Sequence, residues 1–156
     1  MGNDQWIAIS NINESSAFTI KIQRVTLVSG KFYTCGTPIK IFSLCRHEFF
    51  FDWIDDDKDK EIPASDIEGH EIGPRTTFVI KSSGLCDSPI GTEGSYELVD
   101  QSNGEVLRTV VWNSPGGDQK NLFEVRGSAG EEWIVGNKGP APHGPIGETF
   151  VSLSRA

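Results

Sequence analysis

Apolar residues recur at every second position along much of the chain. Phe18, Ile20 and Ile22 are separated by the polar residues Thr19 and Lys21. The same spacing is found at Val25 and Leu27, Phe78 and Ile80, Tyr96 and Leu98, and Val151 and Leu153. Because successive side chains of a β-strand point to opposite faces, this spacing predicts strands that each bury one face.

Clusters of glycine, proline, asparagine and serine separate these strands, at 102–104, 114–117, 127–130 and 139–142. The clearest hairpin joins 96–100 to 105–112 through Asn103-Gly104. Asn-Gly supplies the positive φ angles of a tight primed turn, so we expect that turn here. Apolar spacing of 3.6 residues is not sustained anywhere, so no amphipathic helix is predicted.

Many short strands with Gly/Pro-rich turns predict an all-β protein, a β-sandwich of two antiparallel sheets. A chain of 156 residues supports one substantial core, so we expect a single domain over 1–156. The segment 41–54 is apolar without regular alternation, which fits either a doubly buried segment or one exposed for binding.

The charge balance limits the classes of partner that the protein is expected to bind. With 22 acidic and 14 basic residues the net charge is -8, which predicts no general affinity for nucleic acid or for an anionic membrane leaflet. Contact with a membrane would then depend on a specific lipid or on apolar side chains. No run approaches the ~18 apolar residues of a spanning helix, and the N-terminal residues lack the pattern of a classical signal peptide.

Residues with reactive or metal-binding side chains do not form a recognisable motif. Cys35, Cys45 and Cys86 are odd in number and lack CxxC spacing, so reduced, packing cysteines are favoured, although Cys35 and Cys45 could close a loop if oxidised. The histidines lie singly, at His47, His70 and His143. We therefore predict no metal site and no cofactor.

An acidic run at 55–61 resembles a calcium loop because Asp55, Asp57 and Asp59 alternate along it. An EF-hand loop needs glycine at its sixth position and glutamate at its twelfth, where this chain has Lys60 and Asp66. A solvated acidic turn is the favoured interpretation.

Asp87 and Glu93 could form a carboxylate pair like that of a glycosidase, but an acidic chain contains many such pairs by chance. No nucleophile with an adjacent base is recognisable, so we predict that the protein is not an enzyme.

Several motifs resemble the aegerolysin family. The most specific is the run 84–94, Gly-Leu-Cys-Asp-Ser-Pro-Ile-Gly-Thr-Glu-Gly, which is followed by Tyr-Glu-Leu-Val-Asp at 96–100. Trp-Asn-Ser-Pro-Gly-Gly at 112–117 and Gly-Pro-Ile-Gly at 144–147 are similar to further family blocks. The resemblance covers most of the chain except about 34–53, which we expect to be an insertion.

The resemblance implies a small acidic β-sandwich of actinoporin-like shape. It also implies a function: recognition of a sphingolipid-type membrane lipid or receptor, and recruitment of a larger perforin-like (MACPF) partner that forms the pore. The chain would then be the recognition component of a two-component cytolysin or insecticidal-type toxin. We expect it to be soluble, to be released without a classical signal peptide and to act at target-cell membranes.

Tryptophans are candidate lipid-binding residues, because an indole suits the headgroup boundary. Trp6 is the first choice, since it also matches the family's N-terminal tryptophan, and Trp53 is the second. The family's recognition acid before the Gly-Thr pair is replaced here by Ile90, and Glu93 could supply a carboxylate from another point of the loop. Trp112 completes the set, although Trp112 and Trp133 lie in strand patterns that favour the core.

Two questions remain open in the sequence. An aliphatic Ile90 cannot accept the hydrogen bonds of a carboxylate, so the headgroup need not be sphingomyelin. The aromatic run at 49–51 could form an exposed apolar tip or part of an additional core strand pair. The alternative functions are a soluble carbohydrate-binding β-sandwich, in which aromatic rings stack on sugars, and a hydrolase using Asp87 and Glu93.

Overall fold

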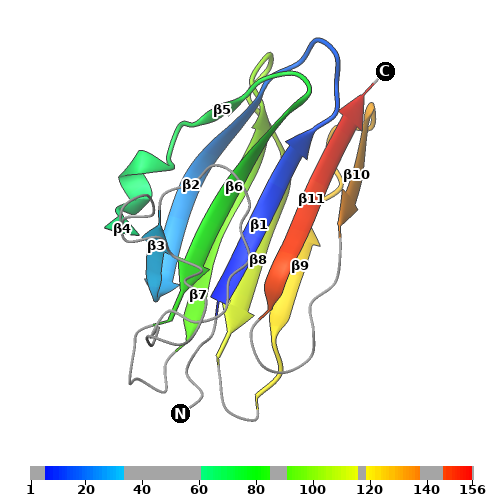
Figure 1. Cartoon of the computed structure of the whole chain (residues 1–156). Helices are drawn as coiled ribbons and strands as arrows, with labels where there is room; N and C mark the ends of the chain where they lie inside the picture. Colours follow the sequence, from blue (N-terminus) through cyan, green and yellow to red (C-terminus); the bar gives the residue numbers. More distant parts are fainter. Residues whose placement is uncertain (1–5, 34–60, 85–90, 116–118, 138–145, 156) are drawn as a thin grey trace.

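The computed structural model describes residues 6–33, 61–84, 91–115, 119–137 and 146–155. They form two sheets stacked face to face (Figure 1). The six-stranded sheet has the order β10 (Trp133–Asn137), β11 (Gly147–Arg155), β1 (Trp6–Asn13), β6 (Thr76–Ser83), β3 (Lys31–Tyr33), β4 (Glu61–Ile62). The five-stranded sheet has the order β5 (Glu71–Ile72), β2 (Ile20–Ser29), β7 (Thr92–Asp100), β8 (Glu105–Ser114), β9 (Leu122–Arg126). Within these ranges the helical structure is a single 3-10 turn, η1 (Ala64–Asp66).

The predicted β-sandwich is confirmed, and the alternation along each strand explains it. On β2, Ile20 and Ile22 are fully buried, while Lys21 between them is partly exposed. Apolar residues from both sheets meet in one core, which includes Ile7, Ile80 and Leu98. Burying one face of each sheet against the other is the main apolar stabilisation of this architecture.

One strand pair departs from the antiparallel prediction. β1 and β11 run parallel, in a register from Ile7 opposite Gly147 to Asn13 opposite Leu153. The other strand pairs within the described residues are antiparallel. Parallel neighbours need a long crossover rather than a hairpin, and here almost the entire domain lies between the two strands. The sheet is therefore mixed.

The predicted hairpin is confirmed as β7 and β8, but its turn is of another kind. Gly104 has a positive φ of 75°, whereas Asn103 is not among the residues with positive φ. The Gly104 amide donates to the Asp100 carbonyl (2.8 Å), and the Ser102 amide donates to Asp100 Oδ1 (3.0 Å). Residues 101–104 thus form a four-residue turn that the Asp100 side chain stabilises, rather than a two-residue primed turn.

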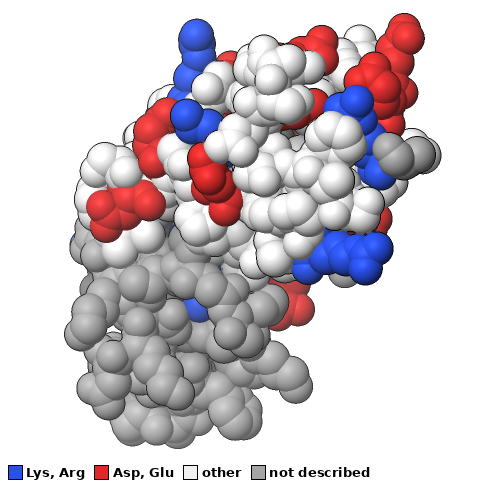
Figure 2. Space-filling view, turned by 90° about the horizontal axis from the view of Figure 1, so that it is seen from above, with Lys and Arg blue, Asp and Glu red and all other residues white. Residues whose placement is uncertain are grey.

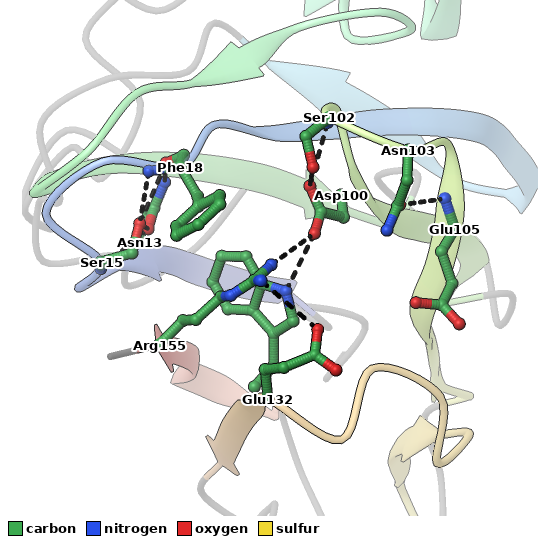
Figure 3. Close-up of polar contacts among 10 residues, drawn as sticks. Asn13, Ser15, Phe18, Asp100, Ser102, Asn103, Glu105, Glu132 and Arg155 are labelled. Carbon is green, nitrogen blue, oxygen red and sulfur yellow. Dashed lines mark hydrogen bonds and ion pairs between the residues drawn. The ribbon is translucent and has the colours of Figure 1, made fainter.

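The upper end of the sandwich in Figure 1 is held by an ion pair between the buried carboxylate of Asp100 and the partly exposed guanidinium of Arg155, shown in Figure 3. Asp100 Oδ2 accepts hydrogen bonds from Trp133 Nε1 (3.1 Å) and from the Arg155 guanidinium (3.1 Å). The guanidinium carbon lies 3.9 Å from the centroid of the Phe18 ring. This cluster joins the last residue of β11 to strands of both sheets.

Figure 2 looks onto this upper end. On the part of this end that is not grey, acidic and basic side chains lie mainly along the edges, with uncharged residues between them. Charges of mixed sign do not form the single-sign field that steers a highly charged partner.

Candidate functional site

Of the predicted lipid-binding residues, Trp6, Glu93 and Trp112 are described, and their strands bring them to one end of the sandwich. Trp6 begins β1 and is in register with Ser83, the last residue of β6. Glu93 lies at the start of β7, and Trp112 lies two residues before the end of β8. This is the lower end in Figure 1, where the described part of the N-terminal strand begins. Trp53 and Ile90 lie outside the described residues.

Trp6 is placed on the outer face of the six-stranded sheet, because the next residue, Ile7, points into the core. Its indole lies beside Gly147, where a Cβ atom would be 3.6 Å from Trp6 Cη2. Only 8% of Trp6 is exposed. Contact between Trp6 and a lipid would therefore involve the edge of the indole or a local rearrangement, and it stays a prediction.

Trp112 is fully buried, which confirms the core interpretation of this residue. Its ring packs against Phe32 and Tyr96, with centroid separations of 6.0 and 6.1 Å. In this structure the indole has no surface through which to touch a lipid. The physical reason is that alternate residues of β8 point inward between the two sheets.

A hydrogen-bonded chain of side chains links the two sheets beside Trp112. Trp112 Nε1 donates to Thr92 Oγ1 (3.1 Å), and Thr92 Oγ1 lies 2.6 Å from Ser82 Oγ on the opposite sheet. All these residues are fully buried. The sequence interpretation missed Thr92 and Ser82, although one signal was present: Thr92 occupies the same inward phase of β7 as Tyr96 and Leu98.

Next to Trp6 lies a buried hydroxyl that lacks a hydrogen bond. Ser83 Oγ is fully buried and has no hydrogen-bond partner among the residues that the structure describes. Because Ser82 points inward to Thr92, Ser83 points to the outer face, in register with Trp6 on one side and Lys31 on the other. An unsatisfied buried hydroxyl costs about 1–3 kcal/mol, so its presence calls for an explanation.

The structure does not bring Glu93 to the face that carries Trp6. Glu93 pairs with Ser29 and Asn113 and is partly exposed on the outer face of the five-stranded sheet. Its neighbours in sequence, Thr92 and Gly94, are both buried. Because strand alternation turns Glu93 away from the core, its carboxylate and the Trp6 indole lie on opposite outer faces of the sandwich.

Most of the remaining candidates cannot be placed relative to this end, because the structure does not describe them. The acidic run at 55–61, the cysteines, His47, His143, Asp87, and the segments 34–53 and 49–51 lie outside the described residues, apart from the backbone of Glu61. His70 stacks on Phe78 with ring centroids 3.6 Å apart. Burial lowers the pKa of His70, and the nearby Glu71 partly opposes this shift. No cluster of three potential metal ligands occurs among the described side chains.

Asp100, at the opposite end, also has a displaced pKa. Burial alone would raise it, but hydrogen bonds from Ser102 and Trp133, together with the Arg155 charge, hold the pKa of this carboxyl below its ordinary value. Asp100 is therefore a structural anion with all its contacts made inside the protein.

Over the described part of the chain, no helix is long and apolar enough to cross a membrane.

This chain is similar in sequence to a protein family and to several known proteins. The sequence profile of the Aegerolysin family matches residues 49–156. Aegerolysin Aa-Pri1 of Cyclocybe aegerita is 30% identical over 97% of this chain and 90% of its own length. Asp-hemolysin of Aspergillus fumigatus is 28% identical over 97% of this chain and 93% of its own. Ostreolysin A6 of Pleurotus ostreatus is 35% identical over 52% of this chain and 59% of its own.

Solved structures share the fold. The RahU protein, whose crystal structure contains a TRIS molecule, superposes with a TM-score of 0.75 at 22% identity, covering 99% of this chain and 97% of RahU. IP-1A from Alcaligenes faecalis superposes with a TM-score of 0.73 at 24% identity, covering 99% of this chain and 93% of IP-1A. At these identities the likeness concerns the fold.

Proposed function

Because the chain belongs to the aegerolysin family, we propose that it recognises a membrane lipid headgroup, with a sphingolipid as the first candidate, and acts as the targeting component of a two-component cytolysin. The names Asp-hemolysin and Ostreolysin describe lytic relatives, which supports a role in membrane damage. On this proposal the chain catalyses no reaction.

The observation that carries the proposal is the corner formed by Trp6, Ser83 and Lys31 on adjacent strands. The corner combines an indole, a buried hydroxyl without a hydrogen-bond partner in the described part of the chain, and a partly exposed lysine. Hydroxyl and ammonium groups donate hydrogen bonds to phosphate oxygens, while an indole suits the boundary between headgroup and acyl chain. On this proposal, a local rearrangement at Trp6 also uncovers the Ser83 hydroxyl, which a phosphate-bearing headgroup then satisfies.

A larger perforin-like partner is proposed to form the channel, because the long strands of this chain are already committed to its core. β7 and β8, of 9 and 10 residues, have the length of membrane-spanning strands. Their inward residues Tyr96 and Trp112 are fully buried. Inserting this hairpin into a bilayer would expose that core. Binding of the chain to lipid would instead raise the local concentration of the partner at the membrane.

The test is sedimentation with vesicles of sphingomyelin/cholesterol, ceramide phosphoethanolamine/cholesterol, and phosphatidylcholine alone. We expect binding to at least one sphingolipid mixture, and at least tenfold weaker binding for Trp6→Ala and Ser83→Ala. Ile134→Ala is the control, because Ile134 is 74% exposed on β10, away from the corner, and should leave binding unchanged.

Absence of binding to every mixture would refute the proposal. Binding on a glycan array by the same protein would then move the function to the carbohydrate-binding alternative.

A further inference from the structure

We infer that Thr92 is the positioning residue for the corner formed by Trp6, Ser83 and Lys31. Its buried hydroxyl fixes the position of this corner, on the six-stranded sheet, relative to Trp112 on the five-stranded sheet. This inference rests on the proposed function. It concerns a residue that would not itself touch lipid.

The hydrogen bonds place Thr92 between the sheets. Its Oγ1 accepts the Trp112 Nε1 proton at 3.1 Å, and it lies 2.6 Å from Ser82 Oγ. Thr92 belongs to β7, whereas Ser82 belongs to β6 of the other sheet. One hydroxyl thus joins two sheets that are otherwise held mainly by apolar contacts, which are not directional.

Close packing makes the position of Thr92 sensitive to small changes. At Gly30, φ is +95°, and a Cβ would lie 2.5 Å from the Ser83 carbonyl oxygen and 2.9 Å from Thr92 Cβ. The connection from β2 to β3 therefore rests directly on Thr92 and Ser83. Lys31 follows Gly30 and is in register with Ser83.

These contacts link Thr92 to residues that are adjacent in sequence to those of the proposed corner. Ser82 precedes Ser83, whose register partners are Trp6 and Lys31. Removing the hydroxyl would leave the buried Trp112 Nε1 without its acceptor and Ser82 Oγ without its partner. Both side chains would then move to form other hydrogen bonds, and the end of β6 would shift with Ser82.

The experiment compares Thr92→Val, which keeps the shape of the side chain and removes the hydroxyl, with Thr92→Ser, which keeps the hydroxyl. The matched control is Tyr96→Phe. Tyr96 Oη donates to Asn11 Oδ1 at 2.5 Å, a buried hydrogen bond between the same two sheets, but nearer the middle of the sandwich. Each variant is tested by thermal unfolding and by sedimentation with the sphingomyelin/cholesterol and ceramide phosphoethanolamine/cholesterol vesicles.

We expect Thr92→Val to bind the preferred vesicles roughly tenfold more weakly, a difference of about 1.4 kcal/mol. Thr92→Ser should bind within about twofold of the wild type. Tyr96→Phe should lower the melting temperature as much as Thr92→Val yet retain binding, because its lost hydrogen bond does not border the corner.

Wild-type-like binding by Thr92→Val, or equal loss of binding by Tyr96→Phe, would overturn the inference while leaving the proposed function standing. Failure of the wild type to bind either sphingolipid mixture would instead overturn the proposed function, and the inference with it.

Discussion

The Trp112 indole can pack where it does only because residue 94 is a glycine without a side chain. A Cβ at Gly94 would lie 2.6 Å from Trp112 Cζ2 and 2.6 Å from the Thr26 carbonyl oxygen. Neither the backbone oxygen nor the enclosed ring can move away easily. Gly94, the second glycine of the Gly-Thr-Glu-Gly run, thus has a packing role next to the candidate site.

We predict that Gly94→Ala lowers the free energy of unfolding by about 2–3 kcal/mol through overpacking. For a chain of this size that corresponds to a fall in melting temperature of roughly 4–12 °C, measured by circular dichroism. Gly73→Ala is the control, since nothing lies within 4 Å of a Cβ built there. Similar melting temperatures for the two variants would contradict the packing argument.

The Asp100 carboxylate should make the protein sensitive to acid. Its native pKa lies below the unfolded value of about 3.9, so the contribution to stability is complete well above that value and is lost as pH falls through the native pKa. We predict that Asp100→Asn costs about 3 kcal/mol at neutral pH, because it leaves the Arg155 charge without its buried partner.

Urea unfolding of wild type and Asp100→Asn at pH 7, 5 and 3 measures both effects. The difference in unfolding free energy between the two proteins should shrink below about pH 4. A difference that stays constant across this range would show that the pKa of Asp100 is the same in the folded and unfolded states.

At the scale of elements, β2 carries a bulge that a remote carboxylate stabilises. The register between β2 and β7 shifts between Gln23 and Thr26, and Arg24 has a positive φ of 54°. The two carboxylate oxygens of Glu68 accept hydrogen bonds from the amides of Arg24 and Val25, both at 2.8 Å. These bonds compensate for the unfavourable backbone conformation of Arg24 and for the amides that leave the ladder.

We predict that Glu68→Ala destabilises the protein by about 2 kcal/mol, more than an exposed glutamate usually contributes, because two backbone donors lose a charged acceptor. Hydrogen exchange should become faster at Arg24 and Val25. Glu148→Ala, at an exposed position on β11, is the control and should change stability by less than about 0.5 kcal/mol. Equal effects of the two substitutions would argue against this role of Glu68.

At the scale of the whole molecule, the last strand is an interior one. β11 lies between β10 and β1, and its residues Val151 and Leu153 are fully buried. Its parallel partner β1 begins the described chain, so this pairing closes the sheet only when both termini are in place. Contacts between residues so distant in sequence are slow to form because a large loop must close.

We predict that a chain ending at Ile146 does not fold, since β10 and β1 lose their common neighbour. The truncated chain should give a circular dichroism spectrum of an unfolded protein and no cooperative thermal transition. A cooperative transition in the truncated chain would show that the sandwich forms without β11.

The alternation of apolar and polar residues was enough to predict the sandwich, the β7–β8 hairpin and the burial of Trp112 and Trp133. A period of two residues in a chain of this size leaves few ways to bury one face of each strand. Motif similarity was enough to predict the family, because short glycine-containing runs are specific even where overall identity is low.

Only the tertiary structure decided which residues share a face or an end. Alternation gives the two sides of each strand, but not which strands become neighbours, because pairing depends on contacts between distant segments. The parallel union of β1 and β11, the placement of Trp6 and Glu93 on opposite outer faces, and the hydrogen bonds of Thr92 all follow from pairing. Of the corner formed by Trp6, Ser83 and Lys31, the sequence singled out Trp6 alone, because the corner exists only once three strands, far apart in the chain, lie side by side.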